Sequence, residues 1–309
     1  MLESSDGTVR LQKFLANVGV ASRRNCEEFI RNGRVTIDGV VVVDPAFGVQ
    51  LDQDVRLDGE RLRMPRYVYF VLNKPKGVLC TNKDPAGRPR AVDFVPVADQ
   101  RVFTVGRLDE NTQGLLLITN DGALAEHLAH PRYEVLRKYR AQVAGIPEPE
   151  TMAELRQGMH FSDGFFRFNN IRLVKRQGRS AFLELELREG KNREIRRLLA
   201  RVGHKVINLQ RTAFGPLRLG NLAPGSCREL SPHEVRELYG FVESPGTHSG
   251  GSGQRRRTNG GKSSRKRSGP KGRTSRASGS RRGAARHGDP AGTARQSRSR
   301  RTKGAARRK

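Results

Sequence analysis

The sequence predicts an α+β protein in which a small module of two helices and a hairpin precedes a larger domain with a mixed or antiparallel sheet. Within about the first 60 residues, two short helical patterns are followed by a strand, a turn and a second strand. Over residues 65–243, short strand and helix patterns lack the regular strand–helix–strand repeat of a parallel sheet. From residue 244 onward, the apolar content falls to scattered alanines. We therefore expect three parts: residues 1–64, 65–243 and 244–309.

The elements of the first module follow from periodicity and from stop signals. Apolar residues recur at helical spacing over residues 10–18, and Gly19 follows as a helix stop. Ser22 is expected to cap a second helix, which ends before Gly33. The turn pair Asp38-Gly39 lies between two β-branched runs and predicts a hairpin. These elements form a compact module.

The larger domain is expected to contain short strands and three helices. A buried strand is predicted at residues 67–72 and a turn at residues 73–77. Further strands are predicted at residues 78–81, 102–105, 115–119, 139–143, 171–174, 181–187 and 206–211. Helices are predicted at residues 122–128, 149–157 and 193–201.

Charge is distributed unevenly along the chain. Residues 245–309 hold 21 Lys and Arg and a single acid, so they contribute +20 of the net +28 and leave +8 for residues 1–244. A segment of this composition cannot bury enough apolar surface to offset the entropy of ordering, and we expect residues 244–309 to be disordered. Such a basic tail favours binding to a polyanion such as nucleic acid. The alternative is a solubilising or targeting extension.

Several classes of site are not indicated by the sequence. The three cysteines are far apart and lack C-x-x-C spacing, which indicates a reducing compartment and argues against a disulfide framework or a zinc knuckle. No run of 18 apolar residues and no hydrophobic leader is present, so we expect a soluble cytoplasmic protein without membrane association. Motifs for phosphate-loop, dinucleotide, zinc-protease and serine-hydrolase sites are absent. His127 and His130 have no further ligands at metal spacing, and we expect no metal and no cofactor.

Three segments hold residues that could form a site. The loop of residues 106–114 presents Asp109 between two strand patterns, although an ordinary turn would also explain its composition. Tyr139 begins a strand among basic residues, which suits stacking on a base but also an ordinary strand tyrosine. Residues 189–199 include the start of a short basic helix in which Arg196 could pair with a carboxylate in a bidentate contact. Such a helix alone is most often a solvated or phosphate-contacting face.

Two family resemblances connect these segments. The segments RLQKFLA (10–16), SRR (22–24) and GRVTIDG (33–39) resemble the RNA-binding module first seen in small-subunit ribosomal protein S-four. A second set resembles the pseudouridine synthases, in particular the branch that modifies ribosomal RNA one site at a time, and most of all its B-type large-subunit enzymes. Its segments are NKPKG (73–77), GRLD (106–109), GLLLITNDG (114–122), HPRY (130–133), EGKNREIRR (189–197) and RTAFG (211–215).

The second resemblance implies roles for three residues. Asp109 would be the catalytic carboxylate, Tyr139 the ring that stacks on the target base, and Arg196 the cation paired with Asp109. The implied reaction turns uridine into its C-glycoside and requires no redox step, metal or nucleotide. Asp109 could add to the sugar carbon or remove the 2′ proton so that a glycal forms, and both routes stay open. Arg137 stands where family members often have Lys; the charge is kept, and we expect little effect.

RNA contacts are expected from basic residues in both parts. They are Lys13, Arg23, Arg24, Arg31, Arg34, Lys74, Arg107, Arg137, Lys138, Lys191, Arg193 and Arg197. For the five in the first module, a solvated charged face is the alternative. The expected partner is ribosomal RNA, above all large-subunit (23S) RNA or a pre-ribosomal particle, bound by a monomer. Two other hypotheses remain: an enzyme of the same fold acting on small-subunit ribosomal RNA or tRNA, and an inert RNA-binding assembly protein. The ordered set Asp109, Tyr139, Arg196 argues against inertness.

Overall fold

The structure, a computed structural model, describes residues 7–97 and 100–243. Within these residues, no helix combines the length and the apolar character that crossing a membrane would require. The prediction of a disordered basic tail concerns residues 244–309, which lie outside the described residues.

The first module has the predicted two helices and hairpin. Gly19 ends the first helix in the left-handed conformation at φ 99°, and the Ser22 side chain accepts a hydrogen bond from the Asn25 N–H at the start of the second. Asp38 and Gly39 both have positive φ at the tip of the hairpin. The elements are β1 (Thr8–Arg10), α1 (Leu11–Val18), α2 (Arg23–Arg31), β2 (Val35–Ile37), β3 (Val40–Val41), β4 (Gly48–Gln50), β5 (Val55–Leu57) and β6 (Glu60–Arg61).

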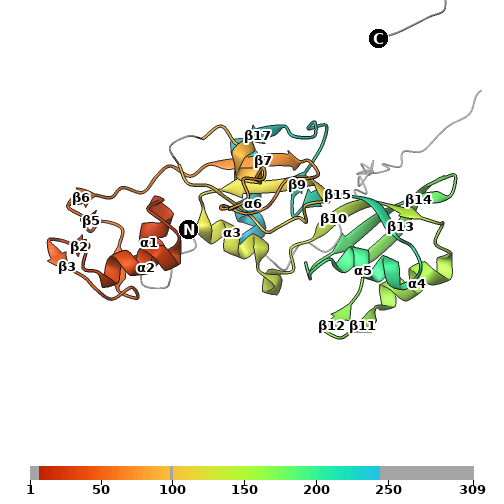
Figure 1. Cartoon of the computed structure of the whole chain (residues 1–309), viewed down its shortest axis with the longest axis horizontal. Helices are drawn as coiled ribbons and strands as arrows, with labels where there is room; N and C mark the ends of the chain where they lie inside the picture. The colour runs from red at the N-terminus through yellow and green to blue at the C-terminus, as the bar shows by residue number, and fades with distance from the viewer. Residues whose placement is uncertain (1–6, 98–99, 244–309) are drawn as a thin grey trace, which may run out of the picture. The chain divides into compact units, whose positions relative to one another are not determined.

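A nine-stranded mixed sheet is the main feature of residues 67–97 and 100–243 (Figure 1). Its strand order is β13-β14-β10-β15-β9-β7-β17, with β16 on β15 and β8 on β9. All pairs are antiparallel except β9 and β15, which are parallel. The strands are β7 (Tyr69–Lys74), β8 (Phe103–Thr104), β9 (Gln113–Thr119), β10 (Arg137–Ala144), β13 (Asn170–Gln177), β14 (Ser180–Leu187), β15 (Val206–Phe214), β16 (Leu217–Arg218) and β17 (Cys227–Glu229).

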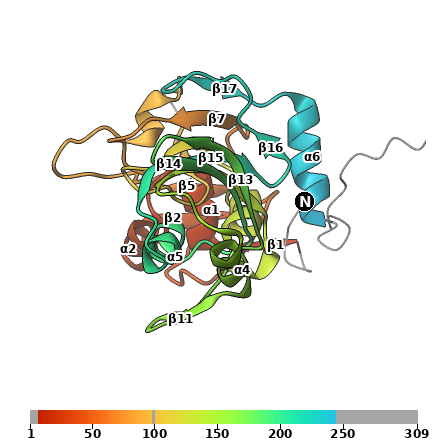
Figure 2. The same cartoon turned by 90° about the vertical axis from the view of Figure 1, so that its right-hand side faces the viewer.

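Helices cover both faces of this sheet. Along β7, residues alternate between two apolar clusters: Leu72 belongs to the cluster that includes residues of α4 and α5, whereas Val71 belongs to the cluster that includes residues of α3 and α6. Figure 2 shows α6 beside β16, and Leu217 and Leu238 belong to one cluster. The remaining elements are η1 (Ala91–Phe94), α3 (Gly122–Ala129), η2 (Pro131–Tyr133), α4 (Pro149–Gln157), a hairpin of β11 (Met159–Phe161) and β12 (Gly164–Phe166), α5 (Glu194–Arg201) and α6 (Pro232–Glu243).

Three features of this domain differ from the prediction. Asn73 and Lys74 are buried strand residues, not turn residues: Asn73 Nδ2 donates to the Leu222 carbonyl at 2.7 Å, and the Lys74 ammonium donates to the Val78 carbonyl at 2.7 Å. The predicted strand at residues 78–81 is wrong: only an isolated bridge from Leu79 to Arg90 forms there. Helix α6 and the β11–β12 hairpin were not predicted, although Val235, Leu238 and Val242 stand at helical spacing in α6.

The two halves of the sheet meet where β9 and β15 pair. Gly114 lies here at φ 110°, and a Cβ atom would stand 2.3 Å from the Arg211 carbonyl oxygen. Only glycine permits this approach of the two backbones. The junction fixes the beginning of β9 and therefore the end of the loop that precedes it.

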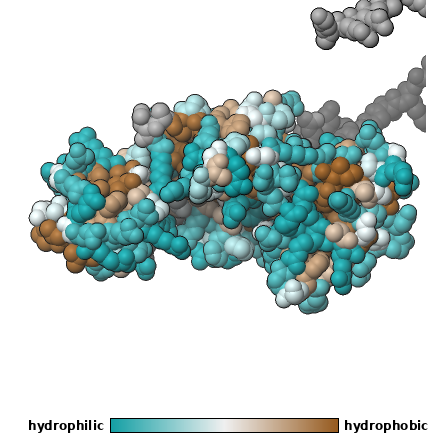
Figure 3. Space-filling view, viewed as in Figure 1, coloured by the Kyte–Doolittle hydropathy of each residue, from teal (hydrophilic) through white to brown (hydrophobic). Residues whose placement is uncertain are grey.

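The outer surface is mainly polar on the face shown in Figure 3, where hydrophobic residues form separate patches. In the first module, Val40 and Val41 on β3 are exposed although they are apolar. Scattered exposed apolar residues are normal in monomeric proteins.

Candidate active site

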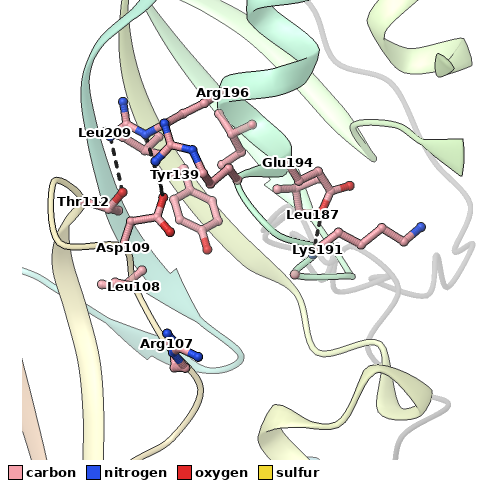
Figure 4. Close-up of a pocket in the computed structure, with 13 residues that line it drawn as sticks. Arg107, Leu108, Asp109, Thr112, Tyr139, Leu187, Lys191, Glu194, Arg196 and Leu209 are labelled. Carbon is pink, nitrogen blue, oxygen red and sulfur yellow. Dashed lines mark hydrogen bonds and ion pairs between the residues drawn. The ribbon is translucent and has the colours of Figure 1, made fainter. Parts of the chain in front are cut away.

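Asp109, Tyr139 and Arg196 line one pocket of about 80 Å³ (Figure 4). Asp109 lies in the loop between β8 and β9, Tyr139 on β10, and Arg196 on α5. Three segments that are far apart in sequence thus meet where the two halves of the sheet join. The sequence predicted this set, and the fold brings it together.

Lys74 holds the loop that carries Asp109 in place through hydrogen bonds to backbone carbonyls. The ammonium of this buried residue donates hydrogen bonds to the carbonyl oxygens of Pro75 (2.9 Å), Val78 (2.7 Å) and Glu110 (3.2 Å). The Gly77 N–H adds a second hydrogen bond to the Glu110 carbonyl at 3.0 Å. Burial lowers the pKa of Lys74. The residue after Asp109 is therefore held by two donors.

Two arginines face the Asp109 carboxylate. Arg196 Nε lies 3.8 Å and Arg193 Nη1 lies 3.7 Å from Asp109 Oδ2. The expected bidentate pair with Arg196 is not formed, because its Nη2 donates instead to the Asn111 carbonyl (3.1 Å) and to Thr112 Oγ1 (3.4 Å). Arg196 Nε is buried without a hydrogen-bond partner. Burial, followed by the charge of Arg193, lowers the pKa of Arg196.

Tyr139 forms part of the pocket wall. Tyr139 is 8% exposed, and in the sheet it lies opposite Leu185 of β14 on one side and Arg211 of β15 on the other. Figure 4 shows its ring beside the Asp109 carboxylate, with Leu187 and Leu209 also lining the pocket. An aromatic surface next to a carboxylate and two cations suits a planar, polar ligand.

Comparisons with known proteins identify the family of this chain. Residues 68–201 match the sequence profile of the family described as RNA pseudouridylate synthase, and residues 9–55 match the S4 domain. An uncharacterized RNA pseudouridine synthase of Aquifex aeolicus is 41% identical over 238 residues, which cover 76% of this chain and 95% of that protein. The chain belongs to the RNA pseudouridine synthases.

Other relatives of this synthase have more specific names. The ribosomal large subunit pseudouridine synthase B of Bacillus subtilis is 39% identical over 236 residues, covering 76% of this chain and 97% of that protein. The protein of the same name from Salmonella typhimurium is 37% identical over 244 residues, covering 76% and 84%. A crystal structure of a pseudouridylate synthase superposes with a TM-score of 0.53 at 27% identity, over 74% of this chain and 99% of that one.

Glu194, at the first position of α5, is a pocket residue that the sequence reasoning missed. It is 5% exposed, and burial raises the pKa of its carboxyl to about 6. Its Oε2 accepts a hydrogen bond from the Lys191 N–H at 3.2 Å. The sequence signal was present: a single acid stands at the start of an otherwise basic helix, where acids are favoured by the helix dipole.

The synthase presents only some of the predicted RNA contacts. Arg107, Lys191 and Arg193 line the pocket beside Asp109. Two other cations in this domain pair with acids at the surface: Lys138 with Glu186 at 2.5 Å, and Arg197 with Asp163 through two hydrogen bonds of 2.7 and 2.6 Å.

Two of the predicted RNA contacts need correction. Lys74 and Arg137 are buried, at 0% and 7% exposure. Arg137 donates to the carbonyls of Val135 and Arg188, and burial lowers its pKa. Both cations therefore hold protein backbone and are closed to RNA in this structure. The sequence did not reveal the burial of Lys74 and Arg137, because both lie in basic motifs and burial depends on the tertiary structure.

In the S4 module, the five predicted basic residues differ in their partners. Arg31 pairs with Glu27 at 2.9 Å, and Arg34 forms two hydrogen bonds with Asp58. Arg23 and Arg24 are exposed at the start of α2, and Lys13 is half-buried on α1.

Proposed function

We propose that this synthase converts a specific uridine of large-subunit ribosomal RNA into pseudouridine, with Asp109 as its catalytic carboxylate. The observation that carries the site assignment is Asp109 facing Arg193 and Arg196 within a pocket walled by Tyr139. The names of the relatives from Bacillus subtilis and Salmonella typhimurium support the choice of large-subunit RNA. The S4 module supports a structured RNA substrate.

The reaction exchanges one glycosidic bond for another. The bond from N1 of uracil to C1′ of the ribose breaks, the detached base turns, and a bond from C5 to C1′ forms. The proton lost from C5 balances the proton gained by N1, so the product is an isomer. Asp109 either adds to C1′ or removes the 2′ proton, and both actions use its ionised carboxylate.

The neighbours of Asp109 have separate tasks in this proposal. Arg196 and Arg193 attract the carboxylate electrostatically and orient it. Tyr139 offers a stacking surface to the detached uracil, and its hydroxyl can relay the C5 proton. The target nucleotide must leave its base stack to enter the pocket, which explains an aromatic wall next to cations that can bind phosphates.

Asp109→Asn is expected to abolish pseudouridine formation and to leave RNA affinity within about a few fold, because an amide can neither attack C1′ nor remove the 2′ proton. Tritium release from RNA labelled at C5 of uridine measures the reaction, and filter binding measures affinity. Asp52→Asn, at an exposed carboxylate of the S4 module, is the control and should retain full activity. Full activity of Asp109→Asn would disprove the assignment of the site.

The choice of RNA is tested by mapping pseudouridines in cells with and without the protein. Loss of a modification in large-subunit RNA, restored by the wild type and not by Asp109→Asn, is the expected result. Loss in small-subunit RNA or tRNA instead would assign the enzyme to that substrate. An unchanged map in all RNAs would contradict the proposal.

A further inference from the structure

We propose that Glu194 is a positioning residue whose carboxylate fixes the turn that holds Arg193 against Asp109. The proposal rests on the proposed role of Asp109. Among the described residues, Glu194 makes no hydrogen bond to Asp109 and would act on it through Arg193. Glu194 is a buried acid within the otherwise basic segment of residues 191–197.

The turn at residues 191–194 is closed by two reciprocal hydrogen bonds. Glu194 Oε2 accepts from the Lys191 N–H at 3.2 Å, and the Glu194 N–H donates to the Lys191 carbonyl at 3.3 Å. Figure 4 shows the first of these contacts beside the pocket. The side chain and the backbone N–H of Glu194 thus bind the backbone N–H and the backbone carbonyl of Lys191.

Arg193 lies inside this turn in a conformation that arginine rarely adopts. Its φ of 47° and ψ of 29° are in the left-handed region. A non-glycine residue stays there only where its surroundings determine the backbone. On one side the Lys191–Glu194 contacts do so, and on the other the Arg197 N–H donates to the Arg193 carbonyl at 3.0 Å. The Glu194 contacts are therefore one of the two sets of hydrogen bonds that hold Arg193 in this conformation.

The burial of Glu194 is unfavourable by itself. A buried carboxylate loses hydration, and its raised pKa records that cost. The charged groups that act on it are Lys191 and Glu189 from the turn and Arg137 from β10; the two cations favour its ionised form, and Glu189 opposes it. An apolar side chain of similar size would avoid the cost. What the carboxylate provides is the acceptor for the Lys191 N–H.

Arg193 is the cation of Asp109 that needs such support. Its side chain is 53% exposed, whereas that of Arg196 is 16% exposed and is held by the Asn111 carbonyl and Thr112. Holding an exposed arginine side chain in one position costs conformational entropy, and water screens its attraction to a carboxylate. The contact of Arg193 with Asp109 therefore depends on where the backbone places Arg193. If the turn relaxes, Arg193 leaves Asp109 first.

The test compares Glu194→Met, which keeps length and removes the acceptor, with Glu194→Gln, which keeps an acceptor oxygen. Hydrogen exchange of the full-length protein without RNA measures the Lys191 amide. We expect exchange to accelerate about tenfold or more in Glu194→Met and to change little in Glu194→Gln. Unchanged exchange in Glu194→Met would overturn the proposal, whatever the RNA substrate is.

The link to Asp109 is tested by a double-mutant cycle with Arg193→Met. Under single turnover, Glu194→Met should slow pseudouridine formation about tenfold in the wild-type background and less than about twofold in the Arg193→Met background, because the effect passes through Arg193. Equal losses in both backgrounds would overturn the positioning role and indicate general destabilisation. If the wild type forms no pseudouridine in any ribosomal RNA, the proposed function fails, and the exchange measurement still decides whether Glu194 fixes the turn.

Discussion

The charged residues around Asp109 differ most in how far each is removed from water. Lys74 and Glu194 are buried, Arg196 is largely covered, and Arg193 is exposed. The buried ones bind backbone groups: Lys74 holds the loop after Asp109, and Glu194 holds the turn before α5. The less buried ones face the carboxylate itself. Rigid support thus comes from buried charges that bind backbone groups, which is how a loop residue can be held in place.

At this scale we predict that Glu194→Gln stabilises the protein more at high pH than at low pH. Folding raises the pKa of Glu194 from 4.5 to about 6, so the folded state binds its proton more tightly and loses stability as pH rises through this window. The glutamine should therefore add about 2 kcal/mol at pH 8 and less than about 1 kcal/mol at pH 5. Chemical denaturation at both pH values measures this.

The control for the stability prediction is Glu229→Gln on β17, where the carboxylate is exposed. Its effect should be small and should not vary between the two pH values in the same way. A Glu194→Gln gain that is equal at pH 5 and pH 8 would show that the carboxyl titrates alike in the folded and unfolded states.

At the scale of elements, the site depends on the junction of β9 with β15. The Asp109 loop leads into β9, while Tyr139 lies on β10, the antiparallel neighbour of β15. The distance between Asp109 and Tyr139 is therefore set by how closely β9 and β15 approach. Gly114 permits that approach because it has no Cβ.

We predict that Gly114→Ala destabilises the protein by more than about 2 kcal/mol and lowers activity further than the stability loss explains. A Cβ would collide with the Arg211 backbone at 2.3 Å and force the two halves of the sheet apart. The φ of 110° adds the strain of a left-handed alanine. Denaturation and tritium release measure the two effects.

Gly87→Ala is the matched control, since Gly87 also has positive φ, at 68°, but a Cβ there meets nothing within 4 Å. It should cost only the strain of the backbone conformation, about 1 kcal/mol, and should leave activity unchanged. If both variants behave alike, the close approach of β9 and β15 is not what holds the site.

At the scale of the whole molecule, charge is the main property that bears on RNA. The net charge of +28 includes +20 from residues 245–309. Within the described part of the chain, many cations pair with acids, as Arg197 does with Asp163 and Arg34 with Asp58. Most of the net positive charge therefore belongs to residues 245–309.

We predict that a chain ending at Ser244 binds RNA with a smaller dependence on salt than the full chain. Each Lys or Arg that neutralises a phosphate releases counterions, so losing the tail should reduce the slope of log affinity against log salt and weaken binding most at low salt. Titrations of ribosomal RNA at several salt concentrations measure the slope. An identical slope for the two chains would show that the tail does not contact RNA.

Local sequence patterns were sufficient for much of the fold. The predicted range of α4 matches the structure, and those of α1, α3, β9 and β10 differ from it by one to three residues at their ends. Helical periodicity predicts α1, α3 and α4 because each has an apolar face, whereas β9 is a continuous apolar run that is buried on both sides. Helix α6 was not predicted, although Val235, Leu238 and Val242 recur at helical spacing along it.

By itself the sequence determined the α+β class, the family and the set Asp109, Tyr139 and Arg196, because motifs record which residues occur in which order. The tertiary structure alone decided which charges face the pocket and which are buried. It placed Arg193 beside Asp109 and revealed that Lys74 binds backbone carbonyls. The physical reason is that the burial of a charged side chain and the choice of its partner depend on groups from distant segments. The neighbouring residues in the sequence do not determine them.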